Sequence, residues 1–253
     1  MARRIAVTGL KGGCGRTTVA VNLAAALALR GNKTLLVDLD PQASATLSLG
    51  ARPGRQEATV YELALGLEKN LARAVVPTPA RDLHLVPSAL RLFGAELELA
   101  EEPDRAKKLS ALLAKLEEGY SIVIVDCPAN FGLLTLNALC ACPEALAPIH
   151  GSYLSMAAVE GLMEVVEAVN GELGPTTSLM GLIPNMIDKR MGGQGALIKK
   201  IEEKYGKSLV RSRIRLDAKL PEAAAAGKPI QIFAPKSNAA YDFEILADDI
   251  SVL

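Results

Sequence analysis

The sequence contains no tryptophan, and all aromatic residues together make up only 4% of it. Proteins that stack the bases of single-stranded nucleic acid use aromatic side chains, so that mode of binding is not expected. The 28 basic residues balance 28 acidic ones, and the formal net charge is zero. A general attraction to nucleic acid is therefore absent, and any contact with DNA has to come from a local basic patch.

Cysteines and long apolar runs are also scarce. The cysteines Cys14, Cys127, Cys140 and Cys142 lack the paired spacing of a zinc site, and 253 residues can bury a core that needs no disulfides. We therefore expect reduced thiols in a cytoplasmic protein. The first residues run directly into an apolar strand pattern, and no apolar run approaches the length of a membrane span. Neither a secretory leader nor a membrane anchor is predicted.

The sequence does contain a regular alternation of short apolar runs and helical patterns. Continuous apolar strands indicate burial on both faces, which is typical of a mostly parallel sheet covered by helices on both sides. With no linker or internal repeat, we predict one α/β domain over residues 1–253. Strands are expected at 5–7, 34–37, 83–86, 121–125, 145–149, 179–183 and 209–210. Helices are expected at 19–30, 55–75, 104–118, 133–140, 155–171, 193–205 and 237–250.

The most specific pattern is the glycine-rich stretch over residues 8–18, Thr-Gly-Leu-Lys-Gly-Gly-Cys-Gly-Arg-Thr-Thr, between the first strand and the first helix. Glycines let backbone N–H groups point inward, and the helix N-terminus adds a positive dipole, so the stretch can cradle phosphate. It departs twice from the pattern G-x-x-x-x-G-K-[ST]: Gly9 falls one position early, and Arg16 replaces the lysine. We expect the N–H groups of Gly13, Gly15 and Arg16 to face phosphates and the Thr17 hydroxyl to ligate Mg²⁺.

Carboxylates follow two of the predicted strands, at Asp40 and Asp126. Ligands of such sheets sit beyond the carboxyl ends of the strands, so both side chains are expected on the same edge as the glycine-rich stretch. A carboxylate there can hold Mg²⁺ through water or orient an attacking water. A helix N-cap is the alternative interpretation of Asp126. Asp38, at alternate spacing, is expected to be structural.

These motifs together resemble the ParA group of deviant Walker ATPases, which partition plasmids, chromosomes and some protein cargoes. The resemblance is carried by Lys-Gly-Gly-x-Gly-x-Thr-Thr, Val-Asp-Leu-Asp-Pro-Gln and Ile-Val-Asp-Cys-Pro-Ala-Asn-Phe-Gly. It continues through Asn185-Met186-Ile187-Asp188 and Ile214-Arg215-Leu216-Asp217, and it covers nearly the whole chain. Because the chain begins at its first strand, it resembles the short members without an N-terminal DNA-binding extension.

The resemblance implies a P-loop NTPase fold and a nucleotide-driven cycle. ATP with Mg²⁺ closes a sandwich homodimer in which Lys11 reaches the partner's phosphates, and the dimer binds DNA without sequence preference. A ParB-like or other cargo adaptor then stimulates hydrolysis, so the protein is expected in the cytoplasm on the nucleoid. Catalytic roles fall to Lys11, Arg16 and Asp40, which positions water, while Thr17 and, through water, Asp126 hold Mg²⁺. The implied nucleotide-binding residues are Lys11, Gly12, Gly13, Cys14, Gly15, Arg16, Thr17, Thr18, Asn185 (near the adenine) and Asp217.

Arg16 is the main departure from the family pattern, in which this position is a lysine on the β- and γ-phosphates. Arginine keeps the charge and can grip phosphate with two N–H groups, but it is bulkier and its geometry differs. Three interpretations remain open: slow turnover, tight binding without useful hydrolysis, and defective binding. We predict that ATP binding survives and that basal hydrolysis is very weak. Ala43 and Ser44 also replace the commoner Gly-Asn after the second strand.

A basic cluster in the C-terminal third is the predicted DNA contact. Cations along a groove give salt-dependent binding that does not depend on sequence, and basic residues of this region contribute to the DNA face in the family. A solvated charged face is the alternative, and Arg215 is the basic residue least expected to touch DNA. The predicted DNA-binding residues are Arg211, Arg213, Lys219, Lys228 and Lys236.

Three other functions are alternatives to partitioning. A division-site ATPase that binds membrane carries a basic amphipathic C-terminal helix, whereas the helical pattern at 237–250 is acidic. An ATPase with a shared iron–sulfur cluster, like nitrogenase iron protein, needs a cysteine pair at the dimer face, and Cys140-x-Cys142 is a poor match. A nucleotide-gated binding module without useful hydrolysis is the strongest competitor, because of Arg16.

Overall fold

The strands of the protein form a single mixed sheet in the order β3-β4-β2-β5-β1-β6-β7. The computed structural model describes residues 1–54, 57–151, 153–174, 176–188 and 190–253. All neighbouring strands run parallel except β3, a two-residue edge strand that is antiparallel to β4. The strands are β1 (Arg3–Val7), β2 (Thr34–Asp38), β3 (Val76–Pro77), β4 (Leu83–Val86), β5 (Ile122–Asp126), β6 (Glu144–His150) and β7 (Ser178–Asn185).

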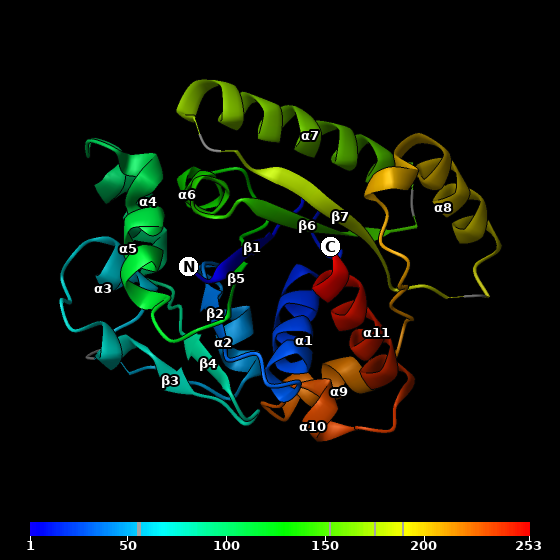
Figure 1. The fold of residues 1–253 in the computed structure, drawn as a ribbon, viewed down its shortest axis with the longest axis horizontal. Coiled ribbons are helices and arrows are strands. Elements are labelled where there is room, and N and C mark those ends of the chain that lie inside the picture. Colours follow the sequence, from blue (N-terminus) through cyan, green and yellow to red (C-terminus); the bar gives the residue numbers. More distant parts are fainter. Residues whose placement is uncertain (55–56, 152, 175, 189) are drawn as a thin grey trace.

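Helices cover both faces of the sheet, because alternate apolar residues of each strand point to opposite sides. Ile5 and Val7 pack with one helical layer and Ala6 with the other. The first layer holds α1 (Arg16–Leu29), α2 (Ser44–Ser48), α9 (Lys219–Ala225), α10 (Ile230–Phe233) and α11 (Asn238–Val252). The second holds α3 (Val60–Ala64), α4 (Leu92–Leu99), α5 (Lys108–Leu116), α6 (Leu133–Ala141), α7 (Tyr153–Leu173) and α8 (Gly192–Tyr205). Figure 1 shows α1 and α9–α11 on the lower right and α4–α7 on the upper left.

Helix α1 is buried on nearly all sides, which explains its run of alanines and leucines. It lies between the sheet and α11, whose Phe243, Leu246 and Ile250 are completely buried in the same core. A helix that is apolar all round is stable only in such a position. The apolar face of the C-terminal helix is therefore used inside the protein, and among the described residues no helix is long and apolar enough to cross a membrane.

The predicted strands are confirmed within two residues at each end, with one exception. Residues 209–210 form only an isolated bridge, between Leu209 and Leu182. The single helix expected at 55–75 is wrong, and residues 55–56 of it lie outside the described part of the chain. Its remainder holds the short helix α3, which begins at a capping box of Thr59 and Glu62, and the 3₁₀ helix η1 (Leu71–Ala74). Gly66, with φ of +70°, separates the two because this backbone turns the chain out of the helix.

Several short elements are missing from the sequence-based prediction. They are α2, α4, α9, α10, β3, η2 (Arg105–Lys107) and η3 (Gly206–Ser208). Elements of two to eight residues carry too few periodic positions to stand out against their surroundings. In α4 the pattern is also blurred, because Phe93 and Leu97 are exposed although they are apolar.

The N-terminus of α6 receives its cap from another helix. Its N-cap residue, Gly132, has no side chain to offer, and Glu96 of α4 accepts a hydrogen bond from the backbone N–H of Leu134 at 3.2 Å. A Cβ atom on Gly132 would lie 2.1 Å from the Glu96 carboxylate, so glycine allows this close approach. A negative charge at this position also complements the helix dipole. This hydrogen bond links the start of α6, the helix that follows β5, to α4.

Removing this cap tests its contribution to stability. We expect Glu96→Ala to lower the free energy of unfolding by about 1 kcal/mol, the usual value of an N-cap side chain. Glu101→Ala is the matched control, because Glu101 is an exposed acid just beyond α4. Urea unfolding of both variants measures the difference. Equal stability of the two variants would show that the Glu96 contact contributes nothing.

Candidate functional site

Three strands end at the same level and define the edge where the glycine-rich loop begins. In the sheet register Val7 of β1 lies beside Asp126 of β5, and Asp126 lies beside Asp38 of β2. Backbone hydrogen bonds continue past the strand ends, from Cys127 N–H to the Val7 carbonyl and from Leu39 N–H to the Asp126 carbonyl. The loop, Asp126 and Asp38 are therefore held on one rigid edge, and Asp40 of the predicted pair lies two residues beyond the end of β2.

The loop is fastened to β7 through Gly15 and Asn185. Gly15 is the N-cap of α1 and has φ of +86°, a conformation that favours glycine. The Asn185 side-chain amide, which is buried, donates a hydrogen bond to the Cys14 carbonyl at 2.7 Å. A Cβ atom on Gly15 would lie 2.4 Å from that amide nitrogen. Asn185 thus positions the loop backbone, and its expected place near an adenine stays a prediction.

The top of the loop is open to solvent. Gly12 and Gly13 are exposed, and a Cβ atom on either would meet nothing within 4 Å. Gly13 has φ of +72°, so the backbone turns here in a way that other residues rarely adopt. Exposed backbone N–H groups next to the start of α1 are available to an anion, and the dipole of the helix favours negative charge at this point.

Arg16 lies beneath the loop and is only 8% exposed. Its Nη1 donates to the carbonyls of Gly9 and Lys11, both at 2.8 Å, and lies 3.7 Å from the Cys14 sulfur. Arg16 Nε is buried without a hydrogen-bond partner among the described residues. The guanidinium therefore holds the two sides of the loop together. Its predicted contact with phosphate stays a prediction.

Asp38 is a structural residue, as expected. Its buried carboxylate accepts hydrogen bonds from the Thr46 N–H at 2.8 Å, from the Thr46 hydroxyl at 2.6 Å and from the Asp40 N–H at 3.1 Å. Burial raises the pKa of Asp38 to about 6, although the Thr46 bonds act in the opposite direction. These contacts fix the turn that carries Asp40 and the start of α2. Nothing in the sequence pattern singles out Thr46 for this role.

Asp126 contrasts with Asp38, because neither oxygen of its buried carboxylate has a hydrogen-bond partner among the described residues. Burial raises the pKa of Asp126 well above its ordinary value, and the neighbouring Asp38 raises it further. The Thr17 hydroxyl lies near enough to oppose this shift but does not reach hydrogen-bond geometry with either oxygen. The N-cap interpretation of Asp126 therefore has no support here.

A buried carboxylate without donors, beside a threonine at a helix N-terminus, fits a divalent cation. The oxygen ligands available are those that Mg²⁺ prefers in sites completed by phosphate and water. Within the described ranges, no group of three or more His, Cys, Asp or Glu side chains could hold a metal by itself. A cation at Thr17 and Asp126 would thus depend on a bound phosphate for the remaining ligands.

Asp40 lies partly exposed on the turn after β2. Its carboxylate oxygen Oδ1 accepts a hydrogen bond from the Gln42 N–H at 2.8 Å. Ala43, which follows, has φ of +54°, in the left-handed region that costs a residue with a side chain about 1 kcal/mol. The commoner glycine at this position would adopt the conformation without strain.

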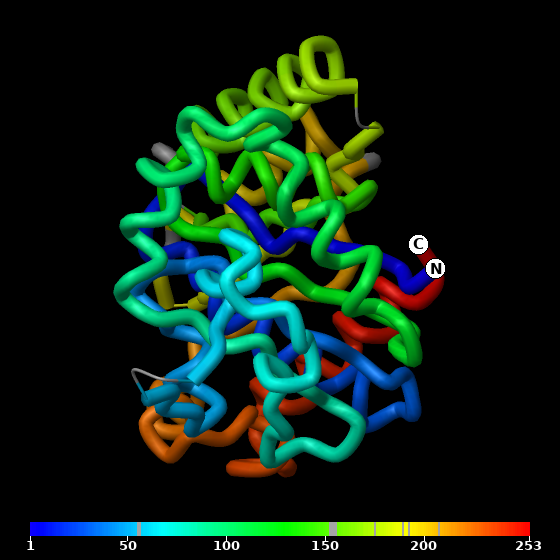
Figure 2. The backbone as a smooth tube through the Cα atoms, turned by 90° about the vertical axis from the view of Figure 1, so that its left-hand side faces the viewer, coloured from blue at the N-terminus to red at the C-terminus, as the bar shows by residue number. Residues whose placement is uncertain are grey.

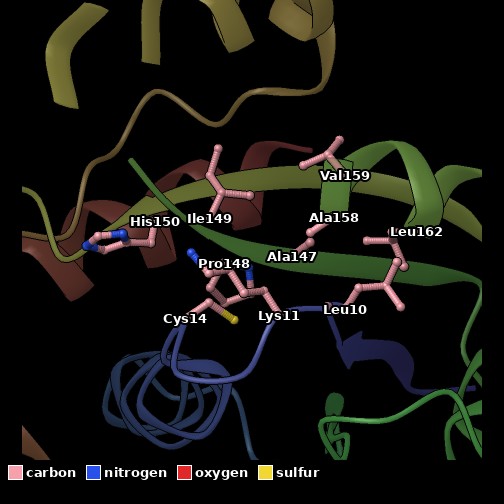
Figure 3. Close-up of a pocket in the computed structure, with 11 residues that line it drawn as sticks. Leu10, Lys11, Cys14, Ala147, Pro148, Ile149, His150, Ala158, Val159 and Leu162 are labelled. Atoms are coloured by element: carbon pink, nitrogen blue, oxygen red, sulfur yellow. The ribbon is translucent and has the colours of Figure 1, made fainter. Parts of the chain in front are cut away.

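The glycine-rich loop packs against β6 and α7. Figure 3 shows Lys11 and Cys14 beside Pro148 at the end of β6, and Leu10 facing Leu162 of α7. The cavity between them measures about 20 Å³, room for about one water and not for a nucleotide. A Cβ atom on Gly161 would lie 2.6 Å from Leu10, so this glycine lets α7 approach the loop closely.

The remaining predicted site residues are not gathered at the loop. Asp217 accepts hydrogen bonds from the backbone N–H groups of Lys219 and Ala239, and so caps α9 and joins it to α11. Arg215 forms an ion pair with Asp242 at 2.6 Å, and its standing as the basic residue least expected to touch DNA stays a prediction. Neither observation places a nucleotide against Asp217, so that role stays a prediction.

The five predicted DNA-binding residues are all exposed but do not form one compact patch. Arg211 lines a groove with Met180 and Leu253, whereas Lys228 lines a different one with Thr18 and Ser48. Two members face acids: Lys219 pairs with Glu222 at 2.6 Å, and Arg213 lies 3.9 Å from Glu202. The five basic residues are therefore spread over more than one part of the surface.

Comparison with known proteins agrees with this geometry. A family model described as an AAA domain matches residues 2–179. The chromosome-partitioning ATPase Soj of Treponema pallidum is 34% identical over 250 residues, which cover 99% of this chain and 97% of that protein. The Soj protein of Thermus thermophilus is 37% identical over 248 residues, covering 98% and 95%. The chain belongs to the ParA family of partitioning ATPases. The resemblance noted in the sequence is thereby confirmed.

A solved structure extends the comparison to three dimensions. Cobyrinic acid a,c-diamide synthase from Mycobacterium smegmatis, with bound ADP and magnesium, superposes with a TM-score of 0.85 at 31% identity. The match covers 98% of this chain and 93% of that one. The fold predicted for this ParA-family chain, a mostly parallel P-loop NTPase sheet with helices on both faces, is confirmed.

The geometry of this ParA-family chain also bears on an iron–sulfur cluster. Cys142 is buried in the core, and burial raises the pKa of its thiol to about 12, which disfavours the thiolate that a cluster needs. Cys140 and Cys142 precede the first residue of β6, at the edge of the sheet opposite the loop. A cluster shared at the loop face is therefore not supported by these cysteines.

The contrast between the two buried aspartates gives a prediction. Because the pKa of Asp126 is raised in the folded protein, the folded state holds its proton more tightly, and the free energy of unfolding falls as the pH rises above about 4. We expect Asp126→Asn to stabilise the nucleotide-free protein by about 1–3 kcal/mol at pH 8. The gain should disappear towards pH 4. In this variant the free energy of unfolding should still fall between about pH 4 and pH 6, because the pKa of Asp38 is raised to about 6.

Asp38→Asn is the matched control, since it replaces a carboxylate that is satisfied by Thr46. Although the pKa of Asp38 is raised as well, we expect the substitution to destabilise the protein by about 2 kcal/mol, because the amide nitrogen of asparagine cannot accept the hydrogen bonds that the replaced oxygen receives. Thermal and urea unfolding between pH 4 and pH 8 measure both variants. If the two substitutions changed stability in the same direction at pH 8, the distinction between a satisfied and an unsatisfied carboxylate would be wrong.

Proposed function

We propose that this ParA-family protein binds ATP with Mg²⁺ at its glycine-rich loop and acts as an ATP-driven partitioning protein. The observation that carries the proposal is the unpartnered carboxylate of Asp126 beside Thr17, next to an open loop at a helix N-terminus. Curated relatives of the same length are named chromosome-partitioning ATPases, and the similar M. smegmatis structure holds ADP and magnesium. These names support a partitioning role for this chain.

In the proposed complex, the loop and its neighbours bind different parts of MgATP. Backbone N–H groups of Gly13, Gly15 and Arg16 hold phosphate oxygens, with the dipole of α1 behind them. The Thr17 hydroxyl and, through water, Asp126 hold Mg²⁺, which supplies charge neutralisation at the phosphates. Asn185 keeps the loop in shape through the Cys14 carbonyl. Asp40 orients the attacking water from its turn after β2.

ATP binding closes a homodimer, in which Lys11 contacts the nucleotide of the partner subunit. The dimer binds DNA without sequence preference through the extended basic set, and so carries its cargo on the nucleoid. A ParB-like or other adaptor stimulates hydrolysis and releases the dimer. Because phosphate contacts are electrostatic, DNA binding in this cycle is expected to weaken with salt.

A nucleotide-gated module without useful hydrolysis is the second candidate, and Arg16 favours it. Arg16 Nη1 carries two hydrogens, and both are directed to loop carbonyls. Only the other guanidinium nitrogens are left for phosphate, and moving Nη1 would uncover the carbonyls of Gly9 and Lys11. A lysine would bring three rotatable donors instead. We therefore expect hydrolysis to be slow in the natural chain.

Sizing and hydrolysis assays with the full chain test the proposal. We expect MgATP, but neither ADP nor the absence of nucleotide, to produce a dimer. Basal hydrolysis should be slow, and Arg16→Lys should raise it by about tenfold, equivalent to ~1.4 kcal/mol in the barrier. Isothermal calorimetry of MgATP on both proteins separates binding from turnover.

Two results would contradict these expectations in different ways. Absence of MgATP binding in calorimetry would refute the proposed function as a whole. Equal turnover of the natural chain and Arg16→Lys would leave nucleotide binding intact but show that the Arg16 contacts do not limit hydrolysis. Asp40→Ala, which should bind MgATP and dimerise without turnover, is the reference for background hydrolysis.

The DNA-binding residues are tested by charge reversal. In the presence of MgATP we expect Arg211→Glu and Lys219→Glu each to weaken binding to a duplex of random sequence and to reduce the salt slope by about 1 or more. Lys115→Glu is the matched control, because Lys115 is an exposed lysine on α5, in the other helical layer. Filter binding over a range of salt concentrations measures the effect. Unchanged affinity in both variants would rule out this assignment.

A further inference from the structure

Helix α4 exposes a stripe of large apolar side chains. Leu90, Phe93 and Leu97 are 71%, 60% and 81% exposed. Phe93 and Leu97 are four residues apart and share one face of α4, and Leu90 lies three residues before Phe93, in the turn that leads into the helix. The opposite face, with Leu92, Ala95 and Leu99, is completely or almost completely buried in the core against the sheet and α5. The helix thus has two apolar faces, and only one of them is used within the chain.

Such a stripe is unusual on a protein surface. Single exposed apolar residues are common, but several on one helical face typically mark an interaction site. The buried face of α4 already supplies what the fold requires, so the exposed face adds nothing to the core. We name this set of three residues, Leu90, Phe93 and Leu97, the α4 stripe.

The surface around the α4 stripe carries negative charge. Between Arg91 and Arg105 the chain has no lysine or arginine and contains Glu96, Glu98, Glu101, Glu102 and Asp104. All of these except Glu96 are exposed. Glu98 accepts a hydrogen bond from Tyr61, and Glu102 pairs with Lys108 at 3.1 Å, while Glu101 and Asp104 form no ion pair with any residue that the structure describes. An apolar stripe with an acidic border is complementary to an apolar face with a basic border.

The position of α4 links this surface to the nucleotide site. Glu96, on the same helix, holds the N-terminus of α6 through Leu134, directly after the segment that follows Asp126. In Figure 1 α4 lies at the outside of its layer, and the exposed Phe93 and Leu97 show that its outer face is open to solvent. Figure 2 views the molecule from that side. A partner can therefore reach α4 from outside, and α4 contacts the start of α6, eight residues along the chain from Asp126.

We propose that the α4 stripe docks an amphipathic helix of a protein partner, with leucine-like side chains on one face and lysine or arginine on its borders. Identifying this partner with the adaptor rests on the proposed function; the docking surface itself does not. A second copy of this chain is a poorer match, because two α4 faces in contact would set acids against acids. An anionic membrane surface is repelled for the same reason.

Fluorescence anisotropy with designed peptides tests this. The probe is a labelled amphipathic helix of leucine and lysine. One control peptide has the same composition rearranged so that the leucines share no face, and another has glutamate in place of lysine. The full chain should bind the probe saturably and at least tenfold more tightly than either control peptide. Phe93→Ser combined with Leu97→Ser should weaken binding at least tenfold.

Matched variants separate the α4 stripe from general stickiness and from misfolding. Leu47→Ser with Leu67→Ser removes exposed apolar side chains elsewhere and should leave binding unchanged. Glu101→Lys with Asp104→Lys should weaken binding of the basic probe, whereas Glu164→Lys with Glu167→Lys on α7 should not. Unfolding midpoint and MgATP binding of the Phe93/Leu97 variant should equal those of the natural chain, and Leu90→Ser serves as an independent second variant.

Three outcomes would overturn the inference. One is equal binding of the probe to the Phe93/Leu97 variant and the natural chain. Another is absence of preference for the probe over its rearranged isomer. The third is nucleotide-independent self-association in sedimentation that the same variant abolishes, which would make a second copy the occupant. Failure of the proposed function is a separate result, because it is read from MgATP binding and ATP-dependent dimerisation.

Discussion

The common level at which β1, β5 and β2 end is the constraint on which the site depends. Parallel hydrogen bonding fixes Val7, Asp126 and Asp38 side by side, and the strands are buried on both faces, so their register cannot slip without exposing the core. The loop grows from the first of these strands and the two carboxylates from the others. One of those carboxylates is satisfied by Thr46, and the other is left without a donor. The same edge therefore contains Asp38, which fixes the turn after β2, and Asp126, which has no hydrogen-bond partner among the described residues and favours a positive charge beside it.

The carboxylate of Asp126 favours binding of a cation but lowers the stability of the chain without one, so activity and stability oppose each other at this residue. A buried carboxylate without partners destabilises the nucleotide-free chain, and the proposed binding of a cation with its phosphates would remove the cost. Arg16 works in the other direction, since it stabilises the empty loop by joining the carbonyls of Gly9 and Lys11. The loop is thus held in shape before any ligand arrives, and the charge that would serve chemistry is partly used for structure.

The sequence predicts the central strands, the loop and the edge where the carboxylates meet, because buried parallel strands and glycine-rich turns leave strong local patterns. It does not reveal what depends on contacts between distant segments. Thr46 below Asp38, Glu96 at the start of α6 and Asn185 on the Cys14 carbonyl join residues 8, 38 and 171 positions apart. The orientation of Arg16 is likewise decided by which acceptors lie within reach, and no spacing rule encodes that. The helix expected at 55–75 failed because Gly66 and Asn70 redirect the chain between two short helices.

The packing of α11 against α1 has a consequence for the order in which the molecule can be completed. Figure 2 shows the N- and C-termini on the same side of the molecule, and Arg3 in β1 donates to the Ile250 carbonyl in α11. The helix whose first turn carries the phosphate loop rests on residues synthesised more than two hundred positions later. During translation α1 would present its alanine- and leucine-rich surface unprotected until α11 emerges. The emerging chain thus has an apolar helix for chaperones to shield before it has a functional nucleotide site.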